Sequence, residues 1–389
     1  MARVYLDYNA TCLPRPSAKE AVAAAMLAPA NASSVHTEGR SARAIVEDAR
    51  HHLALLINAE RDALFFTSGA TESNATALVP ELELEGKPVR CDVLLLSDVE
   101  HPAVRAGGGF KESQIEYVPV DANGVIRLDA LEAALAKHNK AGRRALVSVM
   151  AANNETGVLQ PLRDVADRVH AVGGVFHSDA VQVLGKIPFD LKESGADLVS
   201  ITSHKLGGPQ GVGALVARHP DTRVPAIMRG GGQERGRRQG TESVAGIAGF
   251  GAAATEANQT VTPEGSRLAT LRAKLEEGIR LVANDAVIFG ERAARLPNTT
   301  FFAAPGISAE TALISFDLDG IALSAGSACS SGKSAASPTL QAMGVASDIG
   351  RGAMRVSMGW NTSEADVTQF LTVWSKVYRT LNKSGARAA

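Results

Sequence analysis

The chain has 389 residues, of which 45% are hydrophobic and 21% are charged, and its formal net charge at pH 7 is −1. This composition can build a sizeable core and gives no reason to expect a nucleic acid partner. No apolar run approaches membrane-spanning length and the first residues lack the apolar stretch of a signal peptide, so we expect a soluble, cytoplasmic protein with no membrane partner.

Strand and helix patterns alternate from about residue 17 to residue 258, which predicts an α/β fold with a doubly wound, parallel or mixed sheet. The polar stretch 259–265 is typical of a linker. Beyond it lie a helical pattern, short strands and a final helix. We therefore predict a large domain over residues 16–260 and a smaller α+β domain formed by residues 1–15 with residues 261–389.

A candidate phosphate site follows the strand-like stretch 63–67. Residues 68–74 read Ser-Gly-Ala-Thr-Glu-Ser-Asn and open a helical pattern. Small residues at a helix start leave backbone N–H groups and the positive end of the helix dipole exposed to an anion. An ordinary capped helix start is the alternative. The segment matches neither a Walker loop nor the three-glycine dinucleotide motif.

Two further polar residues close short apolar strands. His101 follows the stretch 94–96, and Asn154 follows the stretch 145–149. An imidazole at a strand end can stack on a planar cofactor or shuttle a proton, although a surface histidine is the alternative.

Asp179 and Lys205 complete this set. Asp179 ends the apolar stretch 175–179, and Lys205 follows the stretch 197–201 just before a Gly/Pro-rich turn. Partial desolvation lowers the pKa of a lysine and makes it a nucleophile for a Schiff base. A neighbouring carboxylate suits pyridoxal phosphate, whose pyridine nitrogen needs an anionic partner. Taken singly, a solvated lysine and a turn carboxylate remain possible, but open α/β sheets bind ligands where such strand ends meet.

The chain resembles the cysteine desulfurases of the nitrogen-fixation and iron–sulfur cluster assembly type, which are class V aminotransferase-like enzymes. The resemblance runs nearly end to end. It rests on residues 5–11 (Tyr-Leu-Asp-Tyr-Asn-Ala-Thr), 67–74, 100–102 (Glu-His-Pro), 153–157 (Asn-Asn-Glu-Thr-Gly), 177–182 (His-Ser-Asp-Ala-Val-Gln), 204–205 (His-Lys), 230–234, 238–241, 326–332 (Gly-Ser-Ala-Cys-Ser-Ser-Gly) and 355–359. It implies a fold-type I enzyme with pyridoxal 5'-phosphate.

The resemblance also implies roles for the reacting residues. Lys205 would hold the cofactor and abstract the α-proton of L-cysteine, and His101 would stack on the cofactor ring. Asp179 would pair with the ring nitrogen. The remaining contacts implied are those of Gln182 and Asn154 with the ring oxygen, and those of Arg355, Asn9 and Asn154 with the substrate.

The phosphate ligands implied by the resemblance come from both subunits of a homodimer. They are Ala70, Thr71, Thr202, Ser203 and His204 of one subunit and Thr241 of the other. The assembly expected is therefore a symmetric pair in which each chain completes its neighbour's site.

Cys329 lies in a stretch, 324–338, composed almost wholly of small residues. Such a stretch lacks apolar anchors, so we expect a mobile surface loop, and the nearby Lys333 favours the thiolate. The resemblance implies that Cys329 attacks the substrate sulfur, becomes a persulfide and passes sulfur to an iron–sulfur scaffold protein. It implies no metal bound in the isolated enzyme, and it implies that Cys329 is the residue that would contact a transferred iron–sulfur cluster.

Cys12 and Ala32 depart from the family pattern, which usually has threonine and proline there, and Cys12 leaves substrate preference open. With Cys91 and Cys329, the chain has too few cysteines for a disulfide framework. Three other functions remain alternatives. Selenocysteine lyase activity is the nearest, other class V chemistry would leave Cys329 unexplained, and a non-enzymatic sulfur carrier would leave Lys205 unexplained. The sequence does not decide between a nitrogen-fixation and a housekeeping acceptor.

Overall fold

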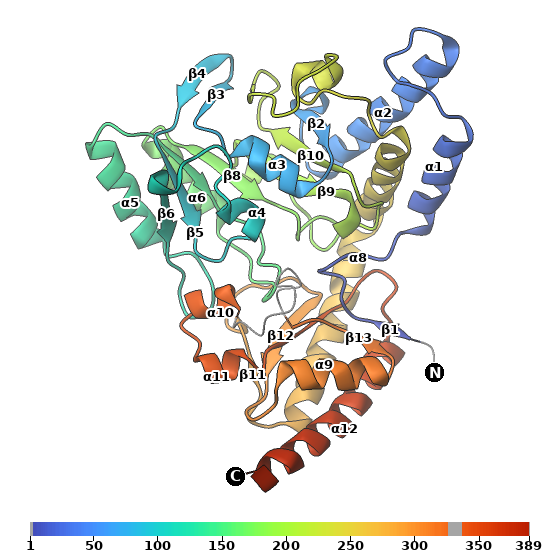
Figure 1. Ribbon diagram of the computed structural model, residues 1–389, viewed down its shortest axis with the longest axis vertical. Helices are drawn as coiled ribbons and strands as arrows, with labels where there is room; N and C mark the ends of the chain where they lie inside the picture. Colours follow the sequence, from blue (N-terminus) through green and yellow to red (C-terminus); the bar gives the residue numbers. More distant parts are fainter. Residues whose placement is uncertain (1–2, 326–336, 389) are drawn as a thin grey trace.

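The computed structural model describes residues 3–325 and 337–388, and a seven-stranded mixed sheet forms its centre (Figure 1). Strand β10 runs antiparallel to both of its neighbours, whereas the other adjacent strands are parallel. This arrangement confirms the predicted α/β class with a mixed sheet. In spatial order the strands are β2 (Leu64–Thr67), β10 (Gly213–Ala217), β9 (Leu198–Thr202), β8 (Val175–Asp179), β7 (Ala145–Ser148), β5 (Val93–Ser97) and β6 (Ile115–Val118).

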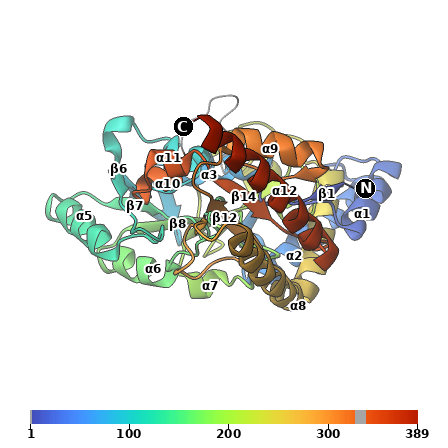
Figure 2. The same ribbon diagram turned by 90° about the horizontal axis from the view of Figure 1, so that it is seen from below.

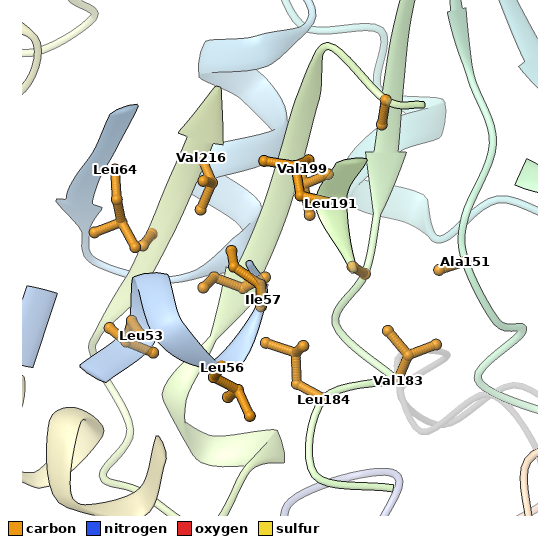
Figure 3. Close-up of a cluster of buried hydrophobic side chains, with 14 of the residues drawn as sticks. Leu53, Leu56, Ile57, Leu64, Ala151, Val183, Leu184, Leu191, Val199 and Val216 are labelled. Carbon is orange, nitrogen blue, oxygen red and sulfur yellow. The ribbon is translucent and has the colours of Figure 1, made fainter. Parts of the chain in front are cut away.

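Helices cover both faces of this sheet, which is why its central strands are nearly continuous apolar runs. Side chains alternate between the faces: Val199 of β9 belongs to one apolar cluster and Leu198 to the other. Figure 3 shows part of the first cluster, with Leu64 beside Val216 on the neighbouring strand and with Leu53 and Leu56 on a helix. The helices on this face include α1 (Pro16–Leu27), α2 (Thr37–Leu56), α5 (Leu128–Lys140), α6 (Leu162–Ala171) and α7 (Leu191–Ser194). The opposite face carries α3 (Ala70–Ala77) and α4 (Pro102–Arg105).

A second unit has its own apolar core, built around Trp374, Phe302, Phe316 and Phe370. The N-terminal strand β1 (Val4–Tyr5) pairs with β13 (Ile321–Ala322) in this unit, as Figure 1 shows near the N-terminus. Its other elements are β11 (Val287–Ile288), β12 (Thr299–Ala303), β14 (Met354–Ser357), α9 (Ala309–Leu318), α10 (Pro338–Ala342), α11 (Ser347–Gly350) and α12 (Glu364–Ala388). A separate hairpin joins β3 (Glu81–Leu84) to β4 (Lys87–Arg90), and short 3-10 turns lie at Arg61–Ala63, Glu112–Gln114, Ser203–Lys205 and Gln233–Gly236.

The predicted linker over residues 259–265 is wrong, because this stretch lies inside the 39-residue helix α8 (Val244–Val282). Ala257 of α8 packs in the first core and Leu268 packs in the second, so burial holds the helix on both sides of Pro263. Figure 2 shows its far end beside α12. The exact domain limits, 16–260 and 1–15 with 261–389, stay a prediction.

Arg15 forms ion pairs with residues on both sides of the proline of α8. Its guanidinium donates to Glu256 at 2.9 Å and to Glu264 at 2.9–3.0 Å, two carboxylates that flank Pro263. Among the described residues, no helix, α8 included, is long and apolar enough to cross a membrane.

Candidate active site

A cavity of about 640 Å³ lies where the large sheet meets the second unit. Strands β5, β8 and β9 contribute residues at or just after their carboxyl ends, and β14 contributes Arg355 from the other side. The structure brings most of the predicted site residues into this one cavity. Those that line it are Asn9, Ala70, Thr71, His101, Asn154, Asp179, Gln182, Thr202, His204, Lys205 and Arg355.

Three predicted residues are not among those lining it. Ser203 is fully buried in the turn before Lys205 and does not line the cavity. Thr241 is exposed and lines a smaller neighbouring hollow that shares Ser68 with the main cavity. Cys329 lies outside the described residues. The roles assigned to these three residues stay predictions.

The start of α3 forms one end of the cavity. Within residues 3–325 and 337–388, no side chain caps this helix, and Ala70 and Thr71 of its first turn line the cavity, where their backbone N–H groups are available to an anion. Strand β10 passes directly behind it: a Cβ at Gly213 would lie 2.7 Å from the backbone of Gly69. This close approach requires glycine at position 213.

His204 also lines the cavity. Burial, with the neighbouring charges of Lys205 and Lys186, lowers the pKa of His204 to about 4. Its Nδ1 lies 3.2 Å from the hydroxyl oxygen of Thr11. The imidazole is therefore neutral at pH 7 and can serve as a hydrogen-bonding group rather than as a cation.

Asp179 lines the cavity from the end of β8. It is buried, and its Oδ2 accepts a hydrogen bond of 2.8 Å from the side chain of Asn74. Its Oδ1 accepts one of 3.0 Å from the backbone N–H of Val181. Two donors thus fix this carboxylate at the end of β8. Asn74 had no role in the sequence analysis, although its place one turn beyond Ala70 puts it on the helix that opens at the cavity.

Glu100 lies beside Asp179 and was also missed. Its Oε1 accepts a bond of 2.6 Å from the N–H of Met150. Burial, together with the charge of Asp179, raises the pKa of Glu100 well above its usual value. Burial therefore favours the neutral form of Glu100 over its carboxylate.

His101 and Lys205 both line the cavity. His101 begins α4, and its Nδ1 accepts from the N–H of Ala103 at 3.1 Å, which fixes the ring. Burial is the main cause that lowers the pKa of His101, so the neutral imidazole is favoured. The amine of Lys205 donates to the carbonyl oxygens of Asn9 and, at 2.8 Å, Ala10.

Arg355 forms the wall contributed by the second unit. Its side chain is almost fully buried, and Nη1 donates to the carbonyl oxygen of Asn154 at 2.9 Å. Because the guanidinium is planar and is positioned by this hydrogen bond, Arg355 is suited to bind a carboxylate with two parallel hydrogen bonds.

The side chain of Asn9 also lies at this wall, but its hydrogen-bonding groups already engage the protein. Nδ2 donates to Thr299 and to the carbonyl of Asn154, and Oδ1 accepts from Lys186 and Asn298. Direct binding of substrate by Asn9 therefore stays a prediction.

Cys12 does not line the main cavity. It lies behind Lys205, at a small internal cavity that Lys186 and Glu264 also line. Burial raises the pKa of the Cys12 thiol to about 11, so it is protonated at neutral pH. An influence of Cys12 on substrate would have to pass through Lys205 rather than through direct contact.

These residues fit pyridoxal phosphate. The uncapped helix start suits its phosphate, the fixed Asp179 carboxylate suits its ring nitrogen and the neutral His101 suits its ring face. Lys205 supplies the amine, and the cavity has the size usual for a cofactor with a small substrate. Fold and site together define a pyridoxal phosphate-dependent enzyme of the aminotransferase type.

Comparison with known proteins carries this assignment further. Residues 4–370 match the family model of class-V aminotransferases. The chain is 39% identical to a cysteine desulfurase of Gluconacetobacter diazotrophicus, covering 100% of this chain and 98% of that protein. It is 37% identical to the cysteine desulfurase IscS of Dictyoglomus turgidum, over 97% and 95% of the two chains. The crystal structure of a NifS-like protein from Rickettsia africae superposes with a TM-score of 0.86 at 30% identity, covering 97% of this chain and 99% of that one. The chain belongs to the cysteine desulfurase family of class-V, pyridoxal phosphate-dependent enzymes.

Proposed function

We propose that this protein is a cysteine desulfurase that uses pyridoxal phosphate to convert L-cysteine to L-alanine, leaving the sulfur on Cys329. The observation that carries the proposal is the convergence of Lys205, Asp179 and Arg355 on one cavity. The full-length similarity to proteins named cysteine desulfurase supports the choice of substrate.

When bound, the cofactor would supply an electron sink for the carbanion at the substrate α-carbon. The residues that would hold it are Asp179 at the ring nitrogen, His101 against the ring, Gln182 and Asn154 at the ring oxygen, and Ala70, Thr71, Thr202, Ser203 and His204 around the phosphate. Because Asp179 is fixed by two donors, it can keep the ring nitrogen protonated without moving.

The protein's own groups would carry out the remaining steps. Arg355 binds the substrate carboxylate and so sets which bond at the α-carbon faces the amine of Lys205. Lys205 takes the α-proton and returns a proton to the carbon skeleton. The thiolate of Cys329 attacks the substrate sulfur: an S–S bond forms, the Cβ–S bond breaks, and the carbon skeleton gains a proton and leaves as alanine. The outer sulfur of the persulfide then passes to a thiolate of an acceptor: an S–S bond to the acceptor forms as the S–S bond to Cys329 breaks, so the sulfur keeps its oxidation state. We propose an iron–sulfur scaffold protein as this acceptor.

We also propose a homodimer in which Thr241 of each chain joins the phosphate site of the other. Thr241 is exposed and lies outside the main cavity of its own chain. The preceding segment carries the exposed apolar residues Ile227 and Met228, which are 55% and 44% exposed in the single chain. Their burial against a second copy would stabilise such a pair.

The direct test incubates the purified protein with pyridoxal phosphate, L-cysteine and a thiol reductant. Sulfide and alanine should appear in equal amounts, and Lys205→Ala should produce neither while melting at a similar temperature. The proposal fails if the wild-type protein does not bind pyridoxal phosphate, or binds it and releases no alanine.

A further inference from the structure

Lys186 is a buried lysine to which neither the sequence motifs nor the proposed chemistry gives a role. It lies in the loop between β8 and α7, four residues after Gln182, and is 6% exposed. Its amine donates to two oxygens, Gln182 Oε1 at 2.5 Å and Asn9 Oδ1 at 2.9 Å. Both acceptors are side-chain amides at the cavity wall.

A lysine amine in this setting fixes which way an amide faces. A side-chain amide carries an acceptor at one end and donors at the other. The amine of Lys186 donates to the oxygen of Gln182, which turns the NH2 group of Gln182 the other way. In the structure that NH2 group donates to the carbonyl oxygen of Asn9 at 3.1 Å.

The same constraint applies to Asn9. Its Oδ1 accepts from Lys186 and, at 3.2 Å, from Asn298, so its NH2 group faces Thr299 and Asn154. The backbone carbonyl of Asn9 in turn accepts from the amine of Lys205. The buried amine of Lys186 thus contacts the side chains of both Gln182 and Asn9, and the backbone of Asn9 contacts Lys205.

Burying this amine is costly. Burial, with the nearby charge of Lys205, lowers the pKa of Lys186 well below its usual value. Lys186 and Lys205 both line the same internal cavity of about 20 Å³, together with Cys12. A methionine would fill the same space without burying a polar group. The cost is understandable if the hydrogen bonds of Lys186 do something that packing alone does not.

We propose that Lys186 is a positioning residue that fixes the amide orientation of Gln182 and Asn9, so that Gln182 presents its NH2 group to the ring oxygen of the cofactor. The inference rests on the proposed function, because it needs pyridoxal phosphate in the cavity with its ring oxygen toward Gln182. It assigns Lys186 no contact with substrate or cofactor.

The test is a double-mutant cycle in which the dissociation constant of pyridoxal phosphate is measured for each variant. The melting temperature of the cofactor-free protein is measured as a second quantity. The variants are Lys186→Met, Gln182→Ala and the double variant. Lys186→Met should weaken cofactor binding by about threefold to tenfold, the range expected of one hydrogen bond. In the Gln182→Ala background the same change should cost much less, because Lys186 acts through Gln182. Lys192→Met, at an exposed lysine of α7, is the matched control and should leave binding unchanged.

Equal effects of Lys186→Met in both backgrounds would overturn the proposal, even if the cofactor-free protein became less stable. If Lys186→Met does not fold, Gln182→Glu takes its place, since a carboxylate still pairs with Lys186 but offers no donor to the ring oxygen. Unchanged cofactor affinity in Gln182→Glu would also overturn the proposal. Failure of the wild-type protein to bind pyridoxal phosphate would instead reject the proposed function.

Discussion

The guanidinium of Arg355 donates from Nη2 to Oδ1 of Asp7 at 2.8 Å, which joins β14 to the segment that follows β1. Asp7 also forms a bridge with Ser357, so the carboxylate stands on the same small-unit framework as the arginine. Asp7 and the carbonyl of Asn154 hold Arg355 from two directions. The guanidinium of Arg355 is therefore positioned by hydrogen bonds within the protein itself.

Arg355→Lys should raise KM for L-cysteine about tenfold to a hundredfold with a smaller effect on kcat. A lysine amine cannot bind a carboxylate in parallel while also reaching Asp7 and Asn154, and a hydrogen bond to a charged group contributes about 1.5–3 kcal/mol. Steady-state kinetics measure the two constants. Arg351→Lys, at an exposed arginine nearby, should change neither. An unaltered KM in Arg355→Lys would remove Arg355 from substrate binding.

Cys329→Ala should lose nearly all alanine production from L-cysteine while still binding the cofactor, because sulfur leaves only when a thiolate captures it. With L-selenocysteine the variant should keep appreciable activity, since selenium departs more easily. Mass spectrometry after a brief L-cysteine pulse should find one added sulfur on the wild-type peptide that contains Cys329. Sulfur on Cys12 or Cys91 instead would contradict the assignment, and burial already raises the thiol pKa of those two residues to about 11 and about 12.

Thr241→Val should weaken binding of pyridoxal phosphate severalfold in the dimer, because it removes a hydroxyl donor and keeps the shape. A neutral hydrogen bond contributes about 0.5–1.5 kcal/mol. Sedimentation at the assay concentration shows the oligomeric state, and a cofactor titration gives the affinity. Thr260→Val, within α8, is the control. A monomer with full activity would rule out the shared site.

His177 should make the fold sensitive to acid. It is fully buried between the hydroxyls of Ser148, at 2.8 Å, and Ser200, at 2.9 Å. Burial lowers its pKa to about 3, against 6.5 for the unfolded chain. Below pH 6.5 the unfolded chain therefore binds a proton that the folded chain does not, and stability falls as the pH drops from 6.5 toward 3.

His177→Gln should cost stability at pH 7.5 but less at pH 5, since the variant lacks this proton uptake. Each pH unit within that window corresponds to at most about 1.4 kcal/mol. Denaturant unfolding at the two pH values measures the difference, with the exposed His51→Gln as control. Parallel pH profiles for wild type and His177→Gln would contradict the expectation.

The sequence was sufficient to predict the strand ends that carry the site. A buried apolar run followed by a polar residue predicts both a strand and its functional end, as for Asp179 and Lys205. Asn74 and Lys186 escaped prediction because their roles depend on partners distant in the chain or on the direction of one amide. The apparent linker at 259–265 failed for a similar reason: Arg15, far away in sequence, holds the helix across Pro263. Local composition carries no trace of such a contact.

Helix α8 is anchored in both apolar cores and crosses from one to the other without a break. Neither core can melt fully without exposing apolar residues of this shared helix, such as Ala257 or Leu268. The unfolding of the two units is therefore thermodynamically coupled, because unfolding of one unit removes packing contacts from the other. Calorimetry should record a single endotherm whose calorimetric and van't Hoff enthalpies agree, where two freely linked domains would give two.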